Sequence, residues 1–337
     1  QSGEEYSGKK YKSPPVGAKI PDGPIHRGFD YFHGFHHARN MEAVIIDDKV
    51  VAHEDPINML PRLTRESAKY IELRKDKKRP FFLYVPLGSP HTPILPTKEW
   101  QGKSGFGAYA DFVMQTDHVM GEIRKALKAT GQDKNTLIIF TSDNGCSKAA
   151  NIPDLAKQGH KVSANLRGSK ADLWDGGHRI PFIVKWPGKI EAGSQSDQLI
   201  CLTDLFSTVG EIIGVKVPSG SCEDSVSFLP ALSGEKIKST RKGVVHHSFS
   251  GHFAYRMGKW KLLLAKASGG WTSPKENQVK EGAPNAQLYN MDMDIGEQKN
   301  LYENEKKIVS EMLSNLESDV MRGRSTDGPK SKNDISF

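Results

Sequence analysis

Two hard oxygen donors stand next to each other in this sequence, at Asp143 and Asn144. They follow the apolar run Leu137–Phe140, which predicts a buried strand that would present both side chains at its tip. Carboxylate and amide oxygens suit Ca²⁺ or Mg²⁺ better than a soft metal. Because Asn144-Gly145 is also a common turn signal, the phrase by itself leaves a metal site and a plain turn both open.

A histidine and a lysine stand in comparable places. His91 comes soon after the apolar run Phe81–Leu87, and ligands of open α/β sheets bind beyond the carboxyl ends of the strands. Lys170 lies in a glycine-containing phrase, where backbone can approach a ligand closely and a compact cation can meet an anion. Taken singly, His91 also fits a structural histidine between prolines, and Lys170 a solvated surface lysine. Metal oxygens, an imidazole and a lysine together favour a hydrolase of anionic esters.

The elements that would position these residues alternate between strands and helices. Continuous apolar runs predict strands covered on both faces, and stripes at helical spacing predict helices between them. The pattern indicates an α/β fold with a mixed, mainly parallel sheet flanked by helices. The expected strands are the hairpin Ala43–Val51 and Phe81–Val85, Thr136–Ser142, Ile180–Trp186 and Gln198–Leu202, and the expected helices are Leu60–Arg74, Tyr109–Leu127 and a short helix capped by Thr203.

The pattern changes after Leu232. Short, closely spaced strands and a final amphipathic helix predict a small antiparallel sheet with one helix. We therefore expect a large domain over residues 1–235, a small α+β subdomain over 236–321 and a disordered polar tail over 322–337. The expected strands of the subdomain are Val244–Ser248, His252–Met257, Lys259–Leu264 and Gln287–Asn290, and its helix spans Lys306–Val320.

Composition excludes some classes of function. The 337 residues, 26% charged and 36% hydrophobic with a net charge of +7, describe an ordinary globular protein of roughly two domains. No basic stripe carries interleaved aromatic residues, so nucleic acid is not an expected partner, and no apolar run approaches the ~18–20 residues of a membrane span. Three cysteines do not make a disulfide framework. Because the first residue is Gln1, we expect that the natural amino terminus has been lost or processed.

Several phrases together resemble the sulfatase family, the formylglycine-dependent branch of the alkaline-phosphatase-like superfamily. Ser89–Pro93 is similar to the family's P-H-x-P phrase, and Ser142–Gly145 is similar to its metal-binding D-N-G. Lys170 with Trp174–Pro181 is similar to the family's lysine followed by E-G-G-x-R-x-P, with an aspartate in the place of the glutamate. The resemblance covers nearly the whole chain, since Pro24–Gly34 is similar to the family's R-G-F-D-x-F-x-G segment and Leu288–Leu301 to its L-Y-N-L and E-x-x-N-L phrases.

The resemblance implies a role for each matching residue. Asp143 and Asn144 would be two ligands of one Ca²⁺ ion, for which Mg²⁺ is a weaker candidate, and the ion would also hold the sulfate ester. Lys170 would neutralise sulfate oxygens, a preorganised contact of ~3 kcal/mol in a dry site. His91 would contact the bridging oxygen and protonate the leaving alkoxide, a contribution of ~10²–10⁴-fold. The family also implies a periplasmic or secreted location.

Two parts of the family's machinery are missing from the sequence. No Cys or Ser stands in the C/S-x-P-S-R phrase that becomes formylglycine, and the family's early Asp-Asp metal pair is absent, since the pair Asp47-Asp48 stands where a hairpin turn is expected. Because both losses fall on the amino-terminal side of Gln1, we expect a truncated chain. The formylglycine would be encoded upstream of residue 1, and the chain alone would be inactive.

Other functions stay open. A non-catalytic homologue that binds sulfated glycans is one alternative, and a phosphodiesterase or phosphonate hydrolase of the same superfamily is another, although the lysine and carboxyl-terminal phrases favour sulfate. The substrate would be a sulfated carbohydrate or an aryl sulfate. His246, His247 and Trp271 are candidate substrate-binding residues at a pocket mouth, or else ordinary strand and loop residues. The sequence does not indicate an oligomeric state.

Overall fold

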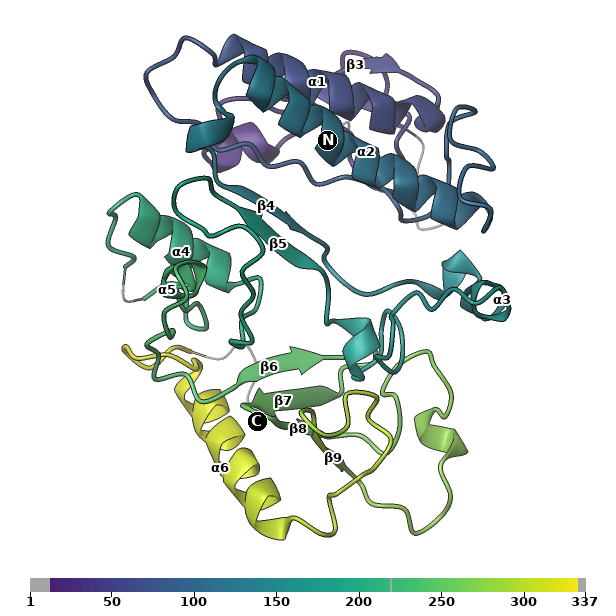
Figure 1. The fold of residues 1–337 in the computed structure, drawn as a ribbon, viewed down its shortest axis with the longest axis vertical. Helices are drawn as coiled ribbons and strands as arrows, with labels where there is room; N and C mark the ends of the chain where they lie inside the picture. The colour runs from purple at the N-terminus through teal and green to yellow at the C-terminus, as the bar shows by residue number, and fades with distance from the viewer. Residues whose placement is uncertain (1–12, 219, 333–337) are drawn as a thin grey trace. The chain divides into compact units, whose positions relative to one another are not determined.

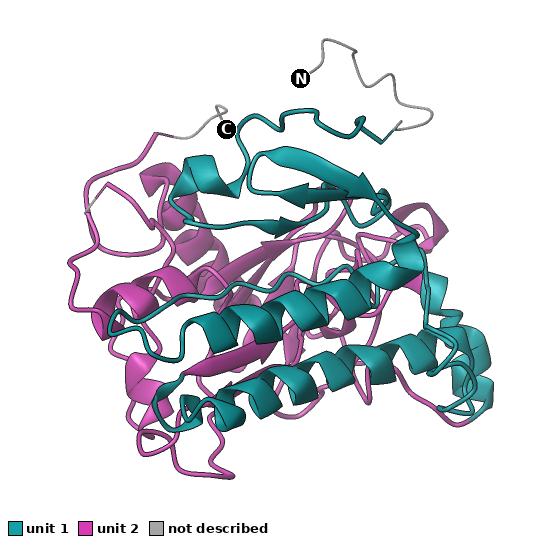
Figure 2. Ribbon diagram, turned by 90° about the horizontal axis from the view of Figure 1, so that it is seen from above, with its two compact units in different colours: residues 1–136, 149–158 teal, residues 137–148, 159–337 magenta. Residues whose placement is uncertain are grey.

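The computed structural model of the protein describes residues 13–218 and 220–332. The chain divides into two compact units, which Figure 2 draws in different colours. Unit 1 comprises Gln1–Thr136 and Ala149–Gln158, and unit 2 comprises Leu137–Lys148 and Gly159–Phe337. Figure 1 labels the elements of both units. Of the sequence-predicted catalytic and metal residues, unit 1 holds His91, and unit 2 holds the others.

Unit 1 contains a small antiparallel sheet. Strand β2 (Ala43–Ile46) lies between β1 (His33–Gly34) and β3 (Lys49–His53), and β2 and β3 form the predicted hairpin. Asp47 occupies the turn with φ of 53°, a left-handed conformation that aspartate tolerates better than most residues. The side chains of this sheet that form a buried cluster are Ala43, Ile45 and Val50.

Two long helices, α1 (Met59–Leu73) and α2 (Ala108–Ala129), lie side by side in unit 1 (Figure 2). Both were predicted, and their ends differ from the prediction by one or two residues. Each buries one apolar stripe, as helical spacing requires. The shorter helical elements up to residue 158 are η1 (Pro24–Arg27), η2 (Pro56–Asn58), η3 (Asp133–Asn135), η4 (Lys148–Ala150) and α3 (Ile152–Lys157).

The segment Phe81–Val85 differs from its prediction as a buried strand. It forms no ladder with another strand among the described residues, and Phe82 and Tyr84 are 67% and 65% exposed. Every second side chain is therefore open to solvent, as in an extended segment covered on one face only. A continuous apolar run predicts an extended segment, but it does not predict which neighbours cover it. Gln198–Leu202, also predicted as a strand, is not assigned to one either.

Unit 2 begins with a two-stranded antiparallel pair. Strand β4 (Ile138–Thr141) pairs with β5 (Phe182–Lys185), and Thr141 lies opposite Phe182 at the end that leads to Asp143. Both strands were predicted. The expected parallel pairing, however, is not found among the ladder pairs of the described residues, which are all antiparallel. The apolar pattern predicts where strands lie in the sequence. Whether two neighbouring strands run parallel or antiparallel depends on the connection between them, which the pattern does not show.

Helix α4 (Asp204–Ile212) follows Thr203, and the short helix α5 (Leu229–Leu232) comes after it. We expected Thr203 to cap α4, but its side chain makes no capping hydrogen bond. The carboxylate of Asp204 accepts the Cys201 N–H at 2.9 Å and pairs with Arg241 at 2.7 Å. Because Asp204 is fully buried, this ion pair holds the start of the helix in place.

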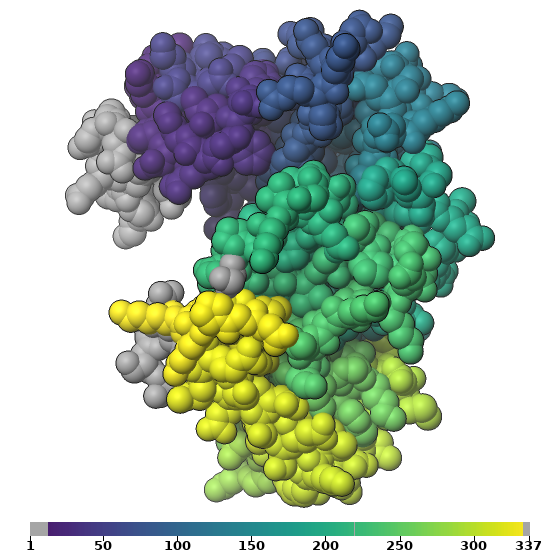
Figure 3. Space-filling view, turned by 90° about the vertical axis from the view of Figure 1, so that its left-hand side faces the viewer, coloured from purple at the N-terminus to yellow at the C-terminus, as the bar shows by residue number. Residues whose placement is uncertain are grey.

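Strands β6 (Val244–His247), β7 (Phe253–Met257), β8 (Trp260–Leu263) and β9 (Gln287–Asn290) form an antiparallel sheet in chain order, and α6 (Lys306–Arg322) packs against it (Figure 1). All five elements were predicted. The fold is therefore mixed α/β with an antiparallel sheet and a final helix at its carboxyl-terminal end. Figure 3 shows that α6 and the residues after it, in yellow, lie at the surface of unit 2. The remaining elements are η5 (Asp175–Gly177) and η6 (Glu276–Gln278).

The residues after α6 were predicted to form a disordered tail, but part of this stretch is packed against the protein. Arg324 and Ser325 are buried, and the Ser325 hydroxyl donates to Asp224 Oδ1 at 2.7 Å. The last part of the predicted tail, residues 333–337, lies outside the described residues. The two compact units do not follow the predicted domain boundary at residue 235, which stays a prediction. Within the described ranges, none of the helices has the length and apolar character needed to cross a membrane.

Candidate active site

Strand β4 delivers Asp143 and Asn144 at its carboxyl end, as the sequence predicted. Asp143 is exposed and Asn144 is half-buried. Among the described residues, neither the Asp143 carboxylate nor the Asn144 amide has a hydrogen-bond or ion-pair partner, and the hydroxyl of Ser142 bonds only the backbone oxygen of Asn144, at 3.0 Å. The oxygens of both side chains are therefore available to a cation.

Glycines fix the loop that carries these two oxygens. The N–H of Gly145 donates to Gly177 O at 2.9 Å, and a Cβ added at Gly145 would lie 1.9 Å from Gly176 O. No real side chain tolerates that distance, so only glycine permits this approach. The Asp143-Asn144 loop thus rests directly on η5.

Lys170 belongs to the same arrangement of loops. Its N–H donates to Cys146 O at 2.8 Å, which ties it to the residue after Gly145. The N–H of Gly176 donates to Arg167 O at 2.7 Å, and a Cβ at Gly176 would lie 2.3 Å from Gly168 O. The half-buried ammonium of Lys170 forms no ion pair with a described residue. The structure therefore joins the loops of Lys170 and of Asp143-Asn144 through η5.

A buried cluster of charges lies beneath η5. Lys261 of β8, whose side chain is 0% exposed, donates to Asp175 Oδ1 at 2.6 Å and to Glu297 Oε1 at 2.7 Å. The other oxygen of Glu297 accepts the N–H of Asp175 at 2.7 Å. Because a buried charge is costly without partners, this triad holds η5 to the carboxyl-terminal sheet.

Sequence reasoning missed this triad. Asp175 lies in the family phrase Trp174–Pro181, Glu297 in the phrase Leu288–Leu301, and Lys261 in the predicted strand Lys259–Leu264, without a predicted contact between them. The signal was present, because Lys261 stands inside the apolar strand Trp260–Leu263. A lysine at such a position needs a buried carboxylate.

The cluster shifts the protonation of its members. Burial would raise the pKa of Asp175, but hydrogen bonds from His178 and Lys261 and the charge of Lys261 hold that pKa well below its ordinary value. Burial raises the pKa of Glu297, against the opposing charge of Lys261. Burial lowers the pKa of His178, and Lys261 Nζ lies 3.3 Å from His178 Nε2. The same nitrogen lies 3.6 Å from Asp175 Oδ1, so His178 Nε2 faces both charged members of the cluster.

His246 and His247, both predicted to line a pocket mouth, lie on opposite faces of β6. His246 faces the charge cluster, with its ring centroid 3.8 Å from that of His178. Its Nε2 is buried without a hydrogen-bond partner among the described residues, and burial lowers its pKa well below the ordinary value. His247 is exposed and lies near Phe253. Adjacent strand residues point to opposite faces, so the two histidines do not share one surface.

Trp271, the third candidate substrate-binding residue, is half-buried in the loop between β8 and β9. Its N–H donates at 2.8 Å to Asp172 Oδ1, whose other oxygen accepts the N–H of Ser169 at 2.8 Å. The structure therefore links the Trp271 loop to the segment that carries Lys170.

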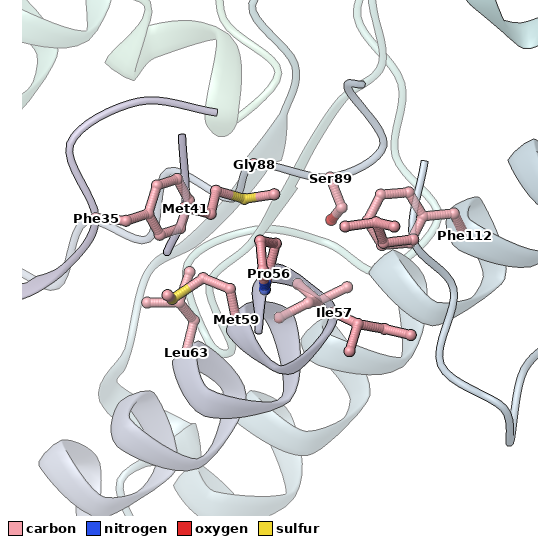
Figure 4. Close-up of a pocket in the computed structure, with 11 residues that line it drawn as sticks. Phe35, Met41, Pro56, Ile57, Met59, Leu63, Gly88, Ser89 and Phe112 are labelled. Atoms are coloured by element: carbon pink, nitrogen blue, oxygen red, sulfur yellow. The ribbon is translucent and has the colours of Figure 1, made fainter. Parts of the chain in front are cut away.

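His91 lies in unit 1, where its loop is well supported. Its Nδ1 is 2.6 Å from Thr92 O, and because a carbonyl oxygen only accepts, Nδ1 carries the proton, while Nε2 has no hydrogen-bond partner among the described residues. The preceding Ser89 hydroxyl accepts from Thr116 of α2 at 2.8 Å. Gly88 and Ser89 border a small cavity of about 10 Å³ (Figure 4). This cavity is too small for a substrate, so it is a packing gap beneath the His91 loop. Its other lining residues include Phe35, Met41, Met59 and Phe112.

The donor set at the end of β4 fits a hard cation. Within the described ranges no group of three or more His, Cys, Asp or Glu side chains is placed to hold a metal ion. Asp143 and Asn144 supply one carboxylate and one amide oxygen, neither of which has a partner in the part of the chain that the structure describes. These are ligands of the kind that Ca²⁺ prefers, although they supply only two of its usual six to eight.

Comparison with known proteins gives a consistent result. Residues 9–215 match the family model described as "Sulfatase", and residues 169–324 match the one described as "N-sulphoglucosamine sulphohydrolase, C-terminal". The chain is 31% identical over 262 residues to N-acetylgalactosamine-6-O-sulfatase of Bacteroides thetaiotaomicron, covering 76% of this chain and 50% of that protein. It is 33% identical over 193 residues to human steryl-sulfatase, covering 56% of this chain and 32% of that protein. The chain thus spans half or less of the length of these relatives.

Solved structures are similar over most of the chain. A sulfatase from a study of glycosaminoglycan metabolism by Bacteroides thetaiotaomicron is 25% identical with a TM-score of 0.69, covering 91% of this chain and 64% of that one. A sulfatase from Pseudoalteromonas is 26% identical with a TM-score of 0.68, covering 86% and 60%. A structure in complex with D-glucosamine-2-N,6-O-disulfate is 18% identical with a TM-score of 0.64, covering 86% and 76%, and at that identity indicates the fold alone.

Proposed function

Because the chain belongs to the sulfatase family, we propose that it carries part of the active site of a sulfate-ester hydrolase. The observation that carries the proposal is the joining of two loops in unit 2. Asp143 and Asn144 lie in the loop after β4, and Lys170 lies in the second loop. Backbone hydrogen bonds connect both loops to η5. All three side chains lack partners among the described residues. A cation site beside a free ammonium is suited to an anionic ester.

In this proposal Asp143 and Asn144 hold Ca²⁺, and Mg²⁺ is the less suitable ion. When bound, the ion would supply positive charge to the sulfate oxygens. Lys170 binds the same group and neutralises charge that grows as the ester bond breaks. The donors are fixed before substrate arrives, because the glycine contacts hold their loops.

His91 supplies the proton in this proposal. With Nδ1–H bonded to Thr92 O, only Nε2 is left to meet the bridging oxygen of the ester. The imidazolium form gives its Nε2 proton to the departing alkoxide. The sequence has no C/S-x-P-S-R phrase, so we propose that the formylglycine and the remaining metal ligands come from a part of the whole protein outside these residues.

The substrate we propose is a sulfated carbohydrate. The support is the relation to N-acetylgalactosamine-6-O-sulfatase, which extends over 76% of this chain, compared with 56% for steryl-sulfatase. A periplasmic or secreted location is part of the same proposal. A non-catalytic glycan-binding homologue is the second candidate, favoured by the missing nucleophile phrase.

The test measures sulfate release by the whole protein from 6-O-sulfated N-acetylgalactosamine and from 4-nitrophenyl sulfate. We expect turnover that is lost on chelation and restored by added Ca²⁺. Asp143→Ala should abolish both turnover and Ca²⁺ binding, because it removes the carboxylate that we propose as a ligand of the ion. Asp197→Ala, at an exposed aspartate, is the matched control. Glycan binding without sulfate release would favour the non-catalytic candidate.

A further inference from the structure

An aromatic pair with a lysine lies beside the loops of the proposed site. The ring centroids of Trp271 and Phe249 are 5.3 Å apart with an interplanar angle of 54°. The ammonium of Lys148 lies 4.9 Å from the centroid of the Trp271 ring. Phe249, in the turn between β6 and β7, is 73% exposed, which is unusual for so large an apolar side chain. These residues are called the aromatic platform below.

Backbone hydrogen bonds hold the platform in place. The carboxylate of Asp172, which is 2% exposed, accepts the N–H groups of Trp271 and Thr272 at 2.8 and 3.0 Å. The N–H of Phe249 donates to Ala171 O at 3.0 Å. Loops fixed in this way present their rings in a set orientation, which reduces the entropy lost when a ligand binds.

The platform is continuous with the loops that carry the proposed sulfate site. Ala171 and Asp172, which hold its two aromatic loops, directly follow Lys170. Lys148 lies two residues after Cys146, whose carbonyl oxygen accepts the Lys170 N–H. One set of backbone contacts in unit 2 therefore joins Lys170, the two rings and Lys148.

Lys148 carries a charge that no carboxylate of the described ranges compensates. No carboxylate among the described residues lies within ion-pair distance of its exposed ammonium, which contacts the face of Trp271 instead. Such a cation–π contact at an exposed site is weak, so an anionic ligand can draw the flexible lysine away and free the ring. The ring face is then open to an apolar surface, and the ammonium to a negative group.

We propose that the aromatic platform is a subsite for a second sugar ring of an anionic oligosaccharide, next to the ring that carries the scissile sulfate. The C–H face of the pyranose packs on Trp271 and Phe249, and Lys148 pairs with a carboxylate on that ring or with a second sulfate on the sugar after it. This inference rests on the proposed function and adds the requirement for a substrate longer than one sugar.

The test measures binding by the 337-residue chain itself, so it does not depend on turnover. The probe is a tetrasaccharide of alternating uronic acid and 6-O-sulfated N-acetylgalactosamine, titrated by calorimetry in the presence of Ca²⁺. We expect Phe249→Ala and Trp271→Ala each to weaken binding about 10-fold or more, since base or ring stacking on one aromatic side chain is worth about that much. Phe249→Ala is informative even if Trp271→Ala perturbs its loop, because Phe249 is largely exposed.

Lys148 is tested through its charge. Lys148→Ala should weaken binding by several-fold, Lys148→Arg should retain it, and the difference should shrink at high salt. A carboxyl-reduced tetrasaccharide separates the two anion sources: if it binds Lys148→Ala and the unaltered chain equally, the carboxylate is the partner, and otherwise a second sulfate is. The matched controls are Lys259→Ala, which removes a lysine 5.7 Å from the Trp260 ring, and Phe206→Ala, which removes another exposed aromatic residue.

The outcomes separate this inference from the proposed function. No measurable binding of the tetrasaccharide by the unaltered chain, or equal losses in the platform and control variants, would overturn the subsite. In the whole protein, the platform variants should lose turnover on the tetrasaccharide but keep it on 4-nitrophenyl sulfate, and equal losses on both would also overturn it. Intact binding without sulfate release by the whole protein would instead remove the proposed function.

Discussion

At the scale of single residues, Lys170 has a charge that no described carboxylate neutralises. In the whole protein, Lys170→Ala should lower kcat/KM by ~10²-fold for every sulfate ester, because the lost contact is to the group that all of them share. Rates on 4-nitrophenyl sulfate and on a sulfated sugar would be compared. Lys157→Ala, at an exposed lysine paired with Asp154, is the control. A loss confined to one substrate would move Lys170 out of the proposed role.

His91 has a role that depends on the leaving group. A nitrophenolate departs without a proton, whereas a sugar alkoxide needs one, so His91→Ala should cost far more on a sulfated sugar, up to the ~10²–10⁴-fold of general acid catalysis. The measurement is the ratio of turnover on the sugar ester to turnover on 4-nitrophenyl sulfate. Equal losses would mean that His91 only supports the loop in which it lies.

The sequence predicted some features of the candidate site and not others. Asp143, Asn144 and Lys170 could be found because their types and glycine neighbours are local signals. Lys261 could not be placed, because its partner Glu297 lies 36 residues away and only folding brings the two together. His246 and His247 were both candidates to line a pocket mouth, and their adjacent positions in β6 place them on opposite faces of the strand.

At the scale of elements, the contact of two loops depends on Gly145. A Cβ there would meet Gly176 O at 1.9 Å, a backbone atom that cannot rotate away. We expect Gly145→Ala to lower the free energy of unfolding by about 2–4 kcal/mol, as severe backbone overlap does, and to weaken Ca²⁺ binding by the whole protein. The measurements are urea denaturation and calorimetry.

The matched control for that substitution is Gly121→Ala. Gly121 lies inside α2 with no atom within 4 Å of an added Cβ. Replacing it should therefore raise the free energy of unfolding by roughly 0.5–1 kcal/mol, because alanine loses less chain entropy in a helix than glycine does. If both variants changed stability in the same direction, the steric account of the Gly145 loop would be wrong.

Two buried histidines, His246 of β6 and His178 directly after η5, predict that the stability of the chain depends on pH. Burial lowers the pKa of His178 and of His246, so the unfolded chain binds more protons than the folded one once the pH is below about 6.5, the ordinary histidine pKa. The free energy of unfolding should therefore fall as the pH drops from 6.5 towards the lowered values, by up to ~1.4 kcal/mol per pH unit for each histidine. Glu297, whose pKa is raised, works in the opposite direction between its unfolded and folded values.

Urea denaturation of the chain at pH 7.5, 6.5 and 5.5 would measure that slope. His246→Phe keeps a ring against His178 but removes one titrating group, so the slope should become smaller. His247→Phe is the control, because His247 is exposed on the other face of β6. A slope unchanged in His246→Phe would show that the buried histidine does not set the acid sensitivity.

At the scale of the whole molecule, elements formed by local pattern were predicted better than their assembly. The stripes of α2 and α6 and the short strands from Val244 to Asn290 are set by neighbours within a few residues. The exposure of Phe82 and the antiparallel pairing of β4 with β5 depend on residues far away in the chain. The alternation of strands and helices was enough to predict the α/β class, and the family resemblance implied the same class.

The last prediction concerns the chain by itself. It holds one carboxylate and one amide for the proposed ion, about a third of the ligands that Ca²⁺ takes, and no phrase that yields formylglycine. We therefore expect the purified chain to bind Ca²⁺ only weakly by calorimetry and to release no sulfate from 4-nitrophenyl sulfate or a sulfated sugar. The same chain should still bind the sulfated tetrasaccharide, because Lys170 and the aromatic platform are all present in unit 2. Measurable turnover would mean that a residue within this sequence acts as the nucleophile, and the proposed division of the active site between this chain and the rest of the protein would be wrong.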